Sequence, residues 1–176
     1  MRRYASLLVM LLSLPASFPG FAAPAVYTGP LAGASEVPPT ASPGTGIATV
    51  SYDPGTGRMT VNVAFDGLIG TTSAAHIHCC TSGPGVNSVF ATPSFPGFPA
   101  GVSSGAYLTS FDMSSPGSYN AAFLASHGNS TAAALAALLD GMGRGGAYFN
   151  IHTVVFPGGE IRADLFEQPI FTDGFQ

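Results

Sequence analysis

The stretch that decides the fold runs from residue 46 to residue 65 and reads GIATVSYDPGTGRMTVNVAF. Its two ends, residues 46–52 and 59–65, both alternate apolar residues with small or polar ones, and the turn-forming sequence DPGTG lies between them. Alternation with a period of two is typical of strands, and a short segment with Pro and Gly between two strands is typical of a tight turn. This stretch therefore predicts an antiparallel β-hairpin.

Further strands are predicted on both sides of the hairpin, because similar segments recur between turn-forming residues. They are residues 26–32, 73–79, 105–113, 146–152 and 160–165. Residues 81–104 are instead rich in Gly, Pro and Ser and contain Phe90, Phe95 and Phe98. Such a segment predicts a long ordered loop whose aromatic side chains attach it to the body of the domain.

Two segments break the strand pattern. Residues 121–124 and 131–139 consist largely of helix formers, and Gly141 is expected to end the second helix. Ser118 and Ser130 are the predicted N-caps. The fold class we expect is all-β, mainly an antiparallel β-sandwich or barrel of roughly seven or eight strands, with two short inserted helices.

The chain begins with the order of a secretory signal peptide. Two arginines precede an apolar run at residues 4–14, and the small residues Gly20, Ala22 and Ala23 follow. We predict cleavage after Ala22, with cleavage after Ala25 as the alternative, so residues 1–22 are the expected signal peptide. The apolar run is shorter than the ~20 residues that a spanning helix needs. A secreted or periplasmic protein without a transmembrane segment in its mature chain is therefore predicted.

The remaining length suits one domain, predicted at residues 23–166, followed by a C-terminal tail at residues 167–176. Only 8% of the residues are charged, none is lysine, and the formal net charge is −4. A basic surface for nucleic acid is therefore not expected. The 46% hydrophobic content argues against disorder, while 23 glycines and 15 prolines favour short strands joined by tight turns.

Three histidines occupy predicted strands in a pattern that suits a metal ion. His76 and His78 are two residues apart, so their side chains leave the strand on the same face. His152 lies in a separate strand, and Glu160 and Arg162 follow on the returning strand. Three imidazoles and one carboxylate form a sensible ligand set for Zn²⁺ or Cu²⁺. We predict that the histidines converge on one ion, with Glu160 as a weaker candidate ligand and Arg162 in a simple ion pair.

Two interpretations of Cys79 and Cys80, which follow His78 directly, remain open. In the first, Cys80 turns toward His78 and supplies a soft ligand to the same ion. In the second, the two cysteines form a vicinal disulfide, because unpaired thiols tend not to persist in an oxidising compartment. The fourth histidine, His127, is expected to stabilise the end of the first helix rather than bind a metal.

The segments that carry the three histidines resemble a known family. Residues 75–78 (AHIH), and residues 148–153 (YFNIHT) followed by 156–162 (FPGGEIR), resemble the two signature segments of the CHRD domain, named for its occurrence in chordin. Residues 31–39 (LAGASEVPP) resemble its opening, and the resemblance spans about residues 25–166. It implies a β-rich module of extracellular and bacterial secreted proteins, with no generally established catalytic activity.

Three functions are compatible with these residues. The first, which we favour, is a noncatalytic module that binds a transition metal, Zn or Cu, or a protein partner through the histidine cluster. The second is a metalloenzyme in which Glu160 acts as general base beside a metal-bound water. The third is a purely structural surface protein. The sequence contains no nucleophile elbow, phosphate loop or dinucleotide fingerprint, so no familiar catalytic motif identifies an enzyme.

Overall fold

The predicted hairpin forms the middle of the sheet. In the computed structural model, which describes residues 23–169, strand β2 (Thr45–Asp53) pairs with β3 (Arg58–Asp66) in a continuous antiparallel register. The carboxylate of Asp53 closes the turn by accepting hydrogen bonds from the backbone amide of Gly55 and the hydroxyl of Thr56. The hairpin is therefore confirmed, together with the turn that directs it.

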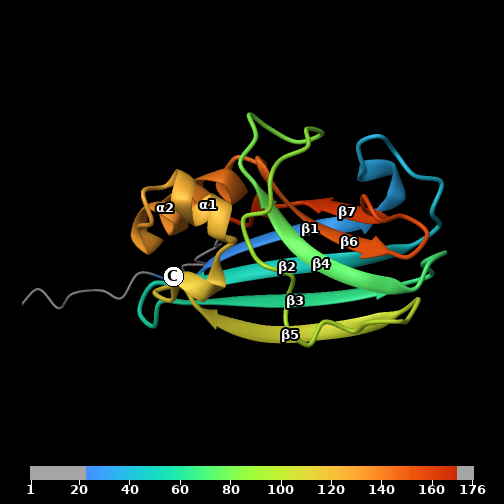
Figure 1. Ribbon diagram of the computed structural model, residues 1–176, viewed down its shortest axis with the longest axis horizontal. Helices are drawn as coiled ribbons and strands as arrows, with labels where there is room; N and C mark the ends of the chain where they lie inside the picture. Colours follow the sequence, from blue (N-terminus) through green and yellow to red (C-terminus); the bar gives the residue numbers. More distant parts are fainter. Residues whose placement is uncertain (1–22, 170–176) are drawn as a thin grey trace, which may run out of the picture.

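Six further strands complete one curled sheet (Figure 1). They are β1 (Ala25–Ala32), β4 (Thr72–Cys79), β5 (Gly105–Asp112), β6 (Ala147–Thr153), β7 (Ile161–Asp164) and β8 (Phe166–Glu167). The order along the sheet is β4-β6-β7-β1-β2-β3-β5, with β8 also paired to β1, and every pairing is antiparallel. The predicted all-β class is confirmed, in the form of a half-barrel.

The two ends of the chain lie outside this description. The predicted signal peptide, residues 1–22, and residues 170–176 of the predicted tail are outside the described residues. Glu167, the first residue of that tail, pairs with Tyr27 of β1. Among the described helices, none has the length and apolar character needed to cross a membrane.

Two helices are inserted between β5 and β6, as predicted, and lie together at one end of the sheet (Figure 1). Helix α2 (Thr131–Gly143) is capped by Ser130, whose hydroxyl accepts from the amide of Ala133 at 3.2 Å. The predicted cap Ser118 is wrong for α1 (Ala121–Ser126). The N-cap of that helix is Asn120, whose side chain accepts a hydrogen bond from the second helical amide at 2.9 Å, because a capping side chain must lie next to the first turn.

Helix α2 also extends two residues beyond Gly141, where an end was expected. Gly141 serves close packing instead of termination, because a Cβ at this position would collide with the Cys79 sulfur. The missing side chain lets α2 rest directly on β4, and the helix therefore continues past the glycine.

The strands β4, β6 and β7 have two buried faces of different character. One face packs into the apolar core, with Ala75, Ile77, Phe149 and Ile151 fully buried. The other face is polar. Residues that lie opposite each other in an antiparallel pair point to the same side, so polar residues of the three strands gather on this face. On it His76 pairs with Asn150, His78 with Tyr148, and Asn150 in turn with Arg162.

The loop between β4 and β5 covers this polar face. Phe95 and Phe98 anchor the loop in the core, as predicted, while Phe90 lies against the histidines and is 41% exposed. Polar strand residues that would ordinarily face solvent are consequently buried. Every one of them needs a hydrogen-bond partner inside the protein or a ligand.

Candidate metal centre

His76, His78 and His152 converge, as the strand pattern predicts. One ring nitrogen from each lies within 4.8 Å of the others, and all three residues are buried. The ring centroids are 5.0 Å apart for His76 and His152 and about 6 Å apart for the two other pairs. The adjacency of β4 and β6 brings together residues separated by more than seventy positions.

Each ring is held by one nitrogen. Nδ1 of His78 lies 2.9 Å from the carbonyl oxygen of Ser88, and Nδ1 of His152 lies 2.9 Å from that of Pro157. A carbonyl only accepts hydrogen bonds, so Nδ1 carries the proton in both rings and Nε2 keeps a lone pair in the neutral form. Nε2 of His76 contacts the Ser94 hydroxyl at 2.8 Å. Metal-binding histidines typically make such a hydrogen bond through the ring nitrogen that does not bind the metal, which fixes the orientation of the ring.

The opposite nitrogens have no partner. Nδ1 of His76, Nε2 of His78 and Nε2 of His152 are buried and make no hydrogen bond. In the described part of the chain, Oδ1 of Asn150 is the only other buried side-chain polar atom in this condition. A buried polar atom without a partner costs about 1–3 kcal/mol. Three such atoms in one cluster indicate a place for a ligand that all three bind together.

The cluster is electrically neutral near pH 7. Burial lowers the pKa of His76 to about 4, with a further contribution from the two other histidines. Burial also lowers the pKa of His78 to about 4, against the opposing effect of its hydrogen bond to Ser88. The pKa of His152 is lowered by burial too. The rings therefore offer unprotonated lone pairs, the form in which imidazole binds metals.

Tyr148 and Arg162 form a stacked frame beside the histidines. The Tyr148 ring stacks on His78 with centroids 4.5 Å apart and planes 8° apart, and the Arg162 guanidinium carbon lies 3.4 Å from the centre of the tyrosine ring. Arg162 is fully buried and pairs with Asp164 at 2.7 Å. Arg162 thus forms an ion pair as expected, but with Asp164 of its own strand, and it is buried because the covering loop encloses the guanidinium, which also donates to Asn87.

Glu160, the weaker candidate ligand, lies outside the group of three histidines and has other partners. Its two carboxylate oxygens accept four hydrogen bonds, from two hydroxyl groups and two backbone amides. The donors are Ser42, Thr153, Ile69 and Gly70. Burial alone would raise the pKa of Glu160, but these hydrogen bonds together hold it below its usual value. Both oxygens of the carboxylate are therefore already engaged within the protein.

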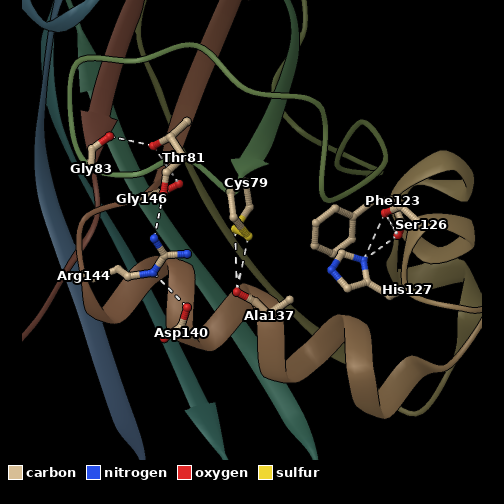
Figure 2. The surroundings of a disulfide bond; sticks show 11 residues. Cys79, Thr81, Gly83, Phe123, Ser126, His127, Ala137, Asp140, Arg144 and Gly146 are labelled. Carbon is tan, nitrogen blue, oxygen red and sulfur yellow. Dashed lines mark hydrogen bonds and ion pairs between the residues drawn. A yellow bond between two sulfur atoms is a disulfide. The ribbon is translucent and has the colours of Figure 1, made fainter.

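Cys80 is not a ligand either, because it forms a vicinal disulfide with Cys79. Of the two interpretations that the sequence leaves open, the structure has the second. The two sulfurs lie 3.8 and 3.3 Å from the carbonyl oxygen of Ala137 on α2, and Figure 2 shows this bond directed at the helix. The strand does not stay regular through Cys80, since β4 ends at Cys79.

His127 lies apart from the cluster, as expected. Its Nδ1 donates to the carbonyl oxygen of Phe123 at 2.7 Å, near the end of α1 (Figure 2). This bond satisfies one of the carbonyl groups left free at a helix C-terminus. His127 is therefore a natural control residue for experiments on the three clustered histidines.

Several residues around the site escape prediction from sequence. Tyr148 carries a detectable signal, since it alternates with Asn150 and His152 on one strand face. The sequence does not show that Phe90 and Ser88 lie against the histidines, because an irregular loop has no period that relates a residue's position to the direction of its side chain.

The half-barrel and its buried histidines define an all-β module with a candidate metal centre. The family model described as "CHRD domain" matches residues 27–165, so the chain belongs to the CHRD domain family. No curated protein and no solved structure gave a significant match. The family assignment confirms the resemblance seen in the signature segments, and the site's chemistry has to be argued from the residues themselves.

Proposed function

We propose that this chain is an exported, noncatalytic CHRD module that binds one transition metal ion, zinc or copper, through His76, His78 and His152. The single observation that carries the proposal is the set of three buried ring nitrogens without hydrogen-bond partners. A shared ion would supply the missing partner of all three at once.

The dimensions support this assignment. Metal–nitrogen distances near 2.0–2.1 Å place the ligand nitrogens of a tetrahedral or trigonal site about 3.3–3.6 Å apart. One nitrogen of each ring already lies within 4.8 Å of a nitrogen of each of the other two rings. Small rotations of the rings about their anchored nitrogens would bring them onto one ion, without a change in the strands that carry them.

Two observations support export and one supports a noncatalytic role. The order of residues 1–22 is that of a signal peptide, and the Cys79–Cys80 disulfide suits an oxidising compartment. Glu160, the residue with which a metalloenzyme would abstract a proton, is already held by four hydrogen bonds. The arrangement therefore favours a site that binds a metal ion over a site that activates a metal-bound water.

The test is metal analysis of the exported protein, followed by titration of the metal-free form with Zn²⁺ and Cu²⁺. We expect one ion per chain. His78→Ala should weaken binding by more than about 100-fold, because even the loss of a group that only orients a metal ligand costs about 10–100-fold. His127→Ala is the matched control and should bind like the wild type. Equal affinity in wild-type and His78→Ala proteins would leave the cluster with a structural role only.

A further inference from the structure

We propose that the ion held by this cluster is Cu(I), bound by three imidazoles in a trigonal arrangement beneath the ring of Phe90. This inference rests on the proposed function and names the metal and its oxidation state. Three independent features of the site support it: its cover, its charge, and the rigidity of the covering segment.

Phe90 is the cover. Its ring centroid lies 4.5 Å from that of His76, 4.6 Å from that of His78, and 6.3 Å from that of His152. The histidines are only 7–9% exposed, whereas Phe90 is 41% exposed. The aromatic ring therefore lies between the histidines and solvent. It restricts the approach of a water molecule to an ion bound by the three nitrogens.

The restricted approach separates the candidate metals. Zn²⁺ in proteins is almost always four-coordinate, and with three histidines its fourth ligand is a water or substrate. Cu(I) is monovalent with a filled d shell and is stable with three ligands, so it needs no fourth group. The face of an aromatic ring is also a favourable neighbour for a cation. A site closed by Phe90 suits the ion that requires the fewest ligands.

The charge of the site leads to the same ion. The three ligands are neutral, and the two described carboxylates bonded on this face already have partners there: Glu36 accepts from Asn150, and Asp164 pairs with Arg162. The buried Arg162 guanidinium adds positive charge beside His78. The cost of burying an ion rises with the square of its charge, so a divalent ion without an anionic ligand is penalised about four times as heavily as a monovalent one.

The cover is fixed in place by backbone hydrogen bonds on both sides. The amide of Cys79 donates to the carbonyl of Val89 at 3.1 Å, and the amide of Ala91 donates to the carbonyl of Ile77 at 2.8 Å. Phe90 itself forms an isolated antiparallel bridge with His78. Phe90 is thus held against β4, the strand that carries two of the ligands. Movement of Phe90 away from the histidines would break these hydrogen bonds.

The test compares Cu(I) and Zn²⁺ on the whole mature protein. Cu(I) affinity is measured without oxygen by competition with a colorimetric Cu(I) chelator, and Zn²⁺ affinity by competition with a fluorescent chelator. X-ray absorption then counts the ligands. We expect Cu(I) to bind at least about 100-fold more tightly than Zn²⁺, a difference of about 2.7 kcal/mol, with three nitrogen ligands and no oxygen.

Three variants separate the lid from general effects. Phe90→Ala should reduce the preference for Cu(I) at least about tenfold and add an oxygen ligand to bound Zn²⁺. Val89→Ala, at an exposed neighbouring position, is the matched control and should keep the wild-type preference. Phe90→Leu retains a bulky apolar cover and should keep most of the preference for Cu(I).

The outcomes distinguish the two proposals. Four-coordinate Zn²⁺ bound as tightly as Cu(I) by the wild type overturns the Cu(I) inference and leaves the metal-binding function standing. The same holds if Phe90→Ala and Val89→Ala keep identical preferences. Absence of binding for both metals, or binding unaffected by His78→Ala, overturns the proposed function together with this inference.

Discussion

Two buried polar clusters on neighbouring strands of the same sheet differ in one respect. The Glu160 carboxylate is fully buried and accepts hydrogen bonds from four donors. The three histidines are nearly as buried, yet each keeps one ring nitrogen without a partner. The first cluster is complete within the protein, and the second is not.

The difference teaches how to separate structural from functional polar residues in this fold. Burial alone does not do so, because both clusters are shielded from water. The useful criterion is unused hydrogen-bonding or coordinating capacity, since folded proteins leave few buried polar groups unpaired. By that criterion Glu160 is structural: it links the segment before β2, the segment before β4 and the last residue of β6. The histidines, in contrast, keep unused coordinating capacity.

The largest effect is expected from breaking the complete cluster. Glu160→Ala leaves buried hydroxyl and amide donors without an acceptor, and we expect the free energy of unfolding to fall by about 3–5 kcal/mol. Urea denaturation measures this loss. Glu167→Gln, at an exposed position, is the control. An unchanged midpoint, or loss of metal binding in a protein that remains folded, would contradict the structural role of Glu160.

The next effect comes from filling the incomplete cluster. Free metal at 100 times Kd should raise the free energy of unfolding by about 2.7 kcal/mol, because the ion binds only the folded state. His152→Gln should abolish this gain while changing the stability of the metal-free protein by less than about 1 kcal/mol. Thermal denaturation with and without metal provides the measurement. A variant that still gains stability from metal would exclude His152 from the site.

Lowering the pH should destabilise the metal-free protein through the histidine cluster. Burial lowers the pKa of His76 and His78 to about 4, against 6.5 in an unfolded chain, with Arg162 adding to the effect at His78. Between these values the unfolded state binds more protons, so stability should fall as pH drops from 6.5 to 4. We expect a slope on the order of 1 kcal/mol per pH unit, and a clearly smaller slope in the His76→Gln/His78→Gln variant, in which only His152 of the cluster still titrates. Equal slopes in both proteins would disprove it.

Glu36 should give the smallest effect, with the opposite sign. Burial raises its pKa to about 7, despite the attraction of Arg162, and Asp164 contributes to the rise. The folded state therefore binds more protons than the unfolded state between pH 4.5 and 7, and its stabilising contribution is lost as pH rises through 7. Glu36→Gln should remove this loss. The free energy of unfolding of the variant, relative to that of the wild type, should therefore be higher at pH 8 than at pH 5. Parallel stability curves would refute the assignment.

Much of the fold follows from local patterns in the sequence. In residues 46–65 both the alternation of the strands and the turn between them are visible in the sequence, and helix-forming residues indicate the two inserted helices. Helix limits are less certain because they depend on contacts. Asn120 replaces Ser118 as a cap, and α2 passes Gly141 because that glycine packs against a disulfide.

The sequence by itself determined which strand residues share a face, and it thereby predicted that His76, His78 and His152 meet. The tertiary structure alone decided that Glu160 and Cys80 have other partners, that each ring has a nitrogen without a hydrogen bond, and that Phe90 lies against the cluster. The physical reason is that side-chain direction along a strand repeats every two residues. Hydrogen-bond partners and lids come from loops distant in the sequence, where no such period exists.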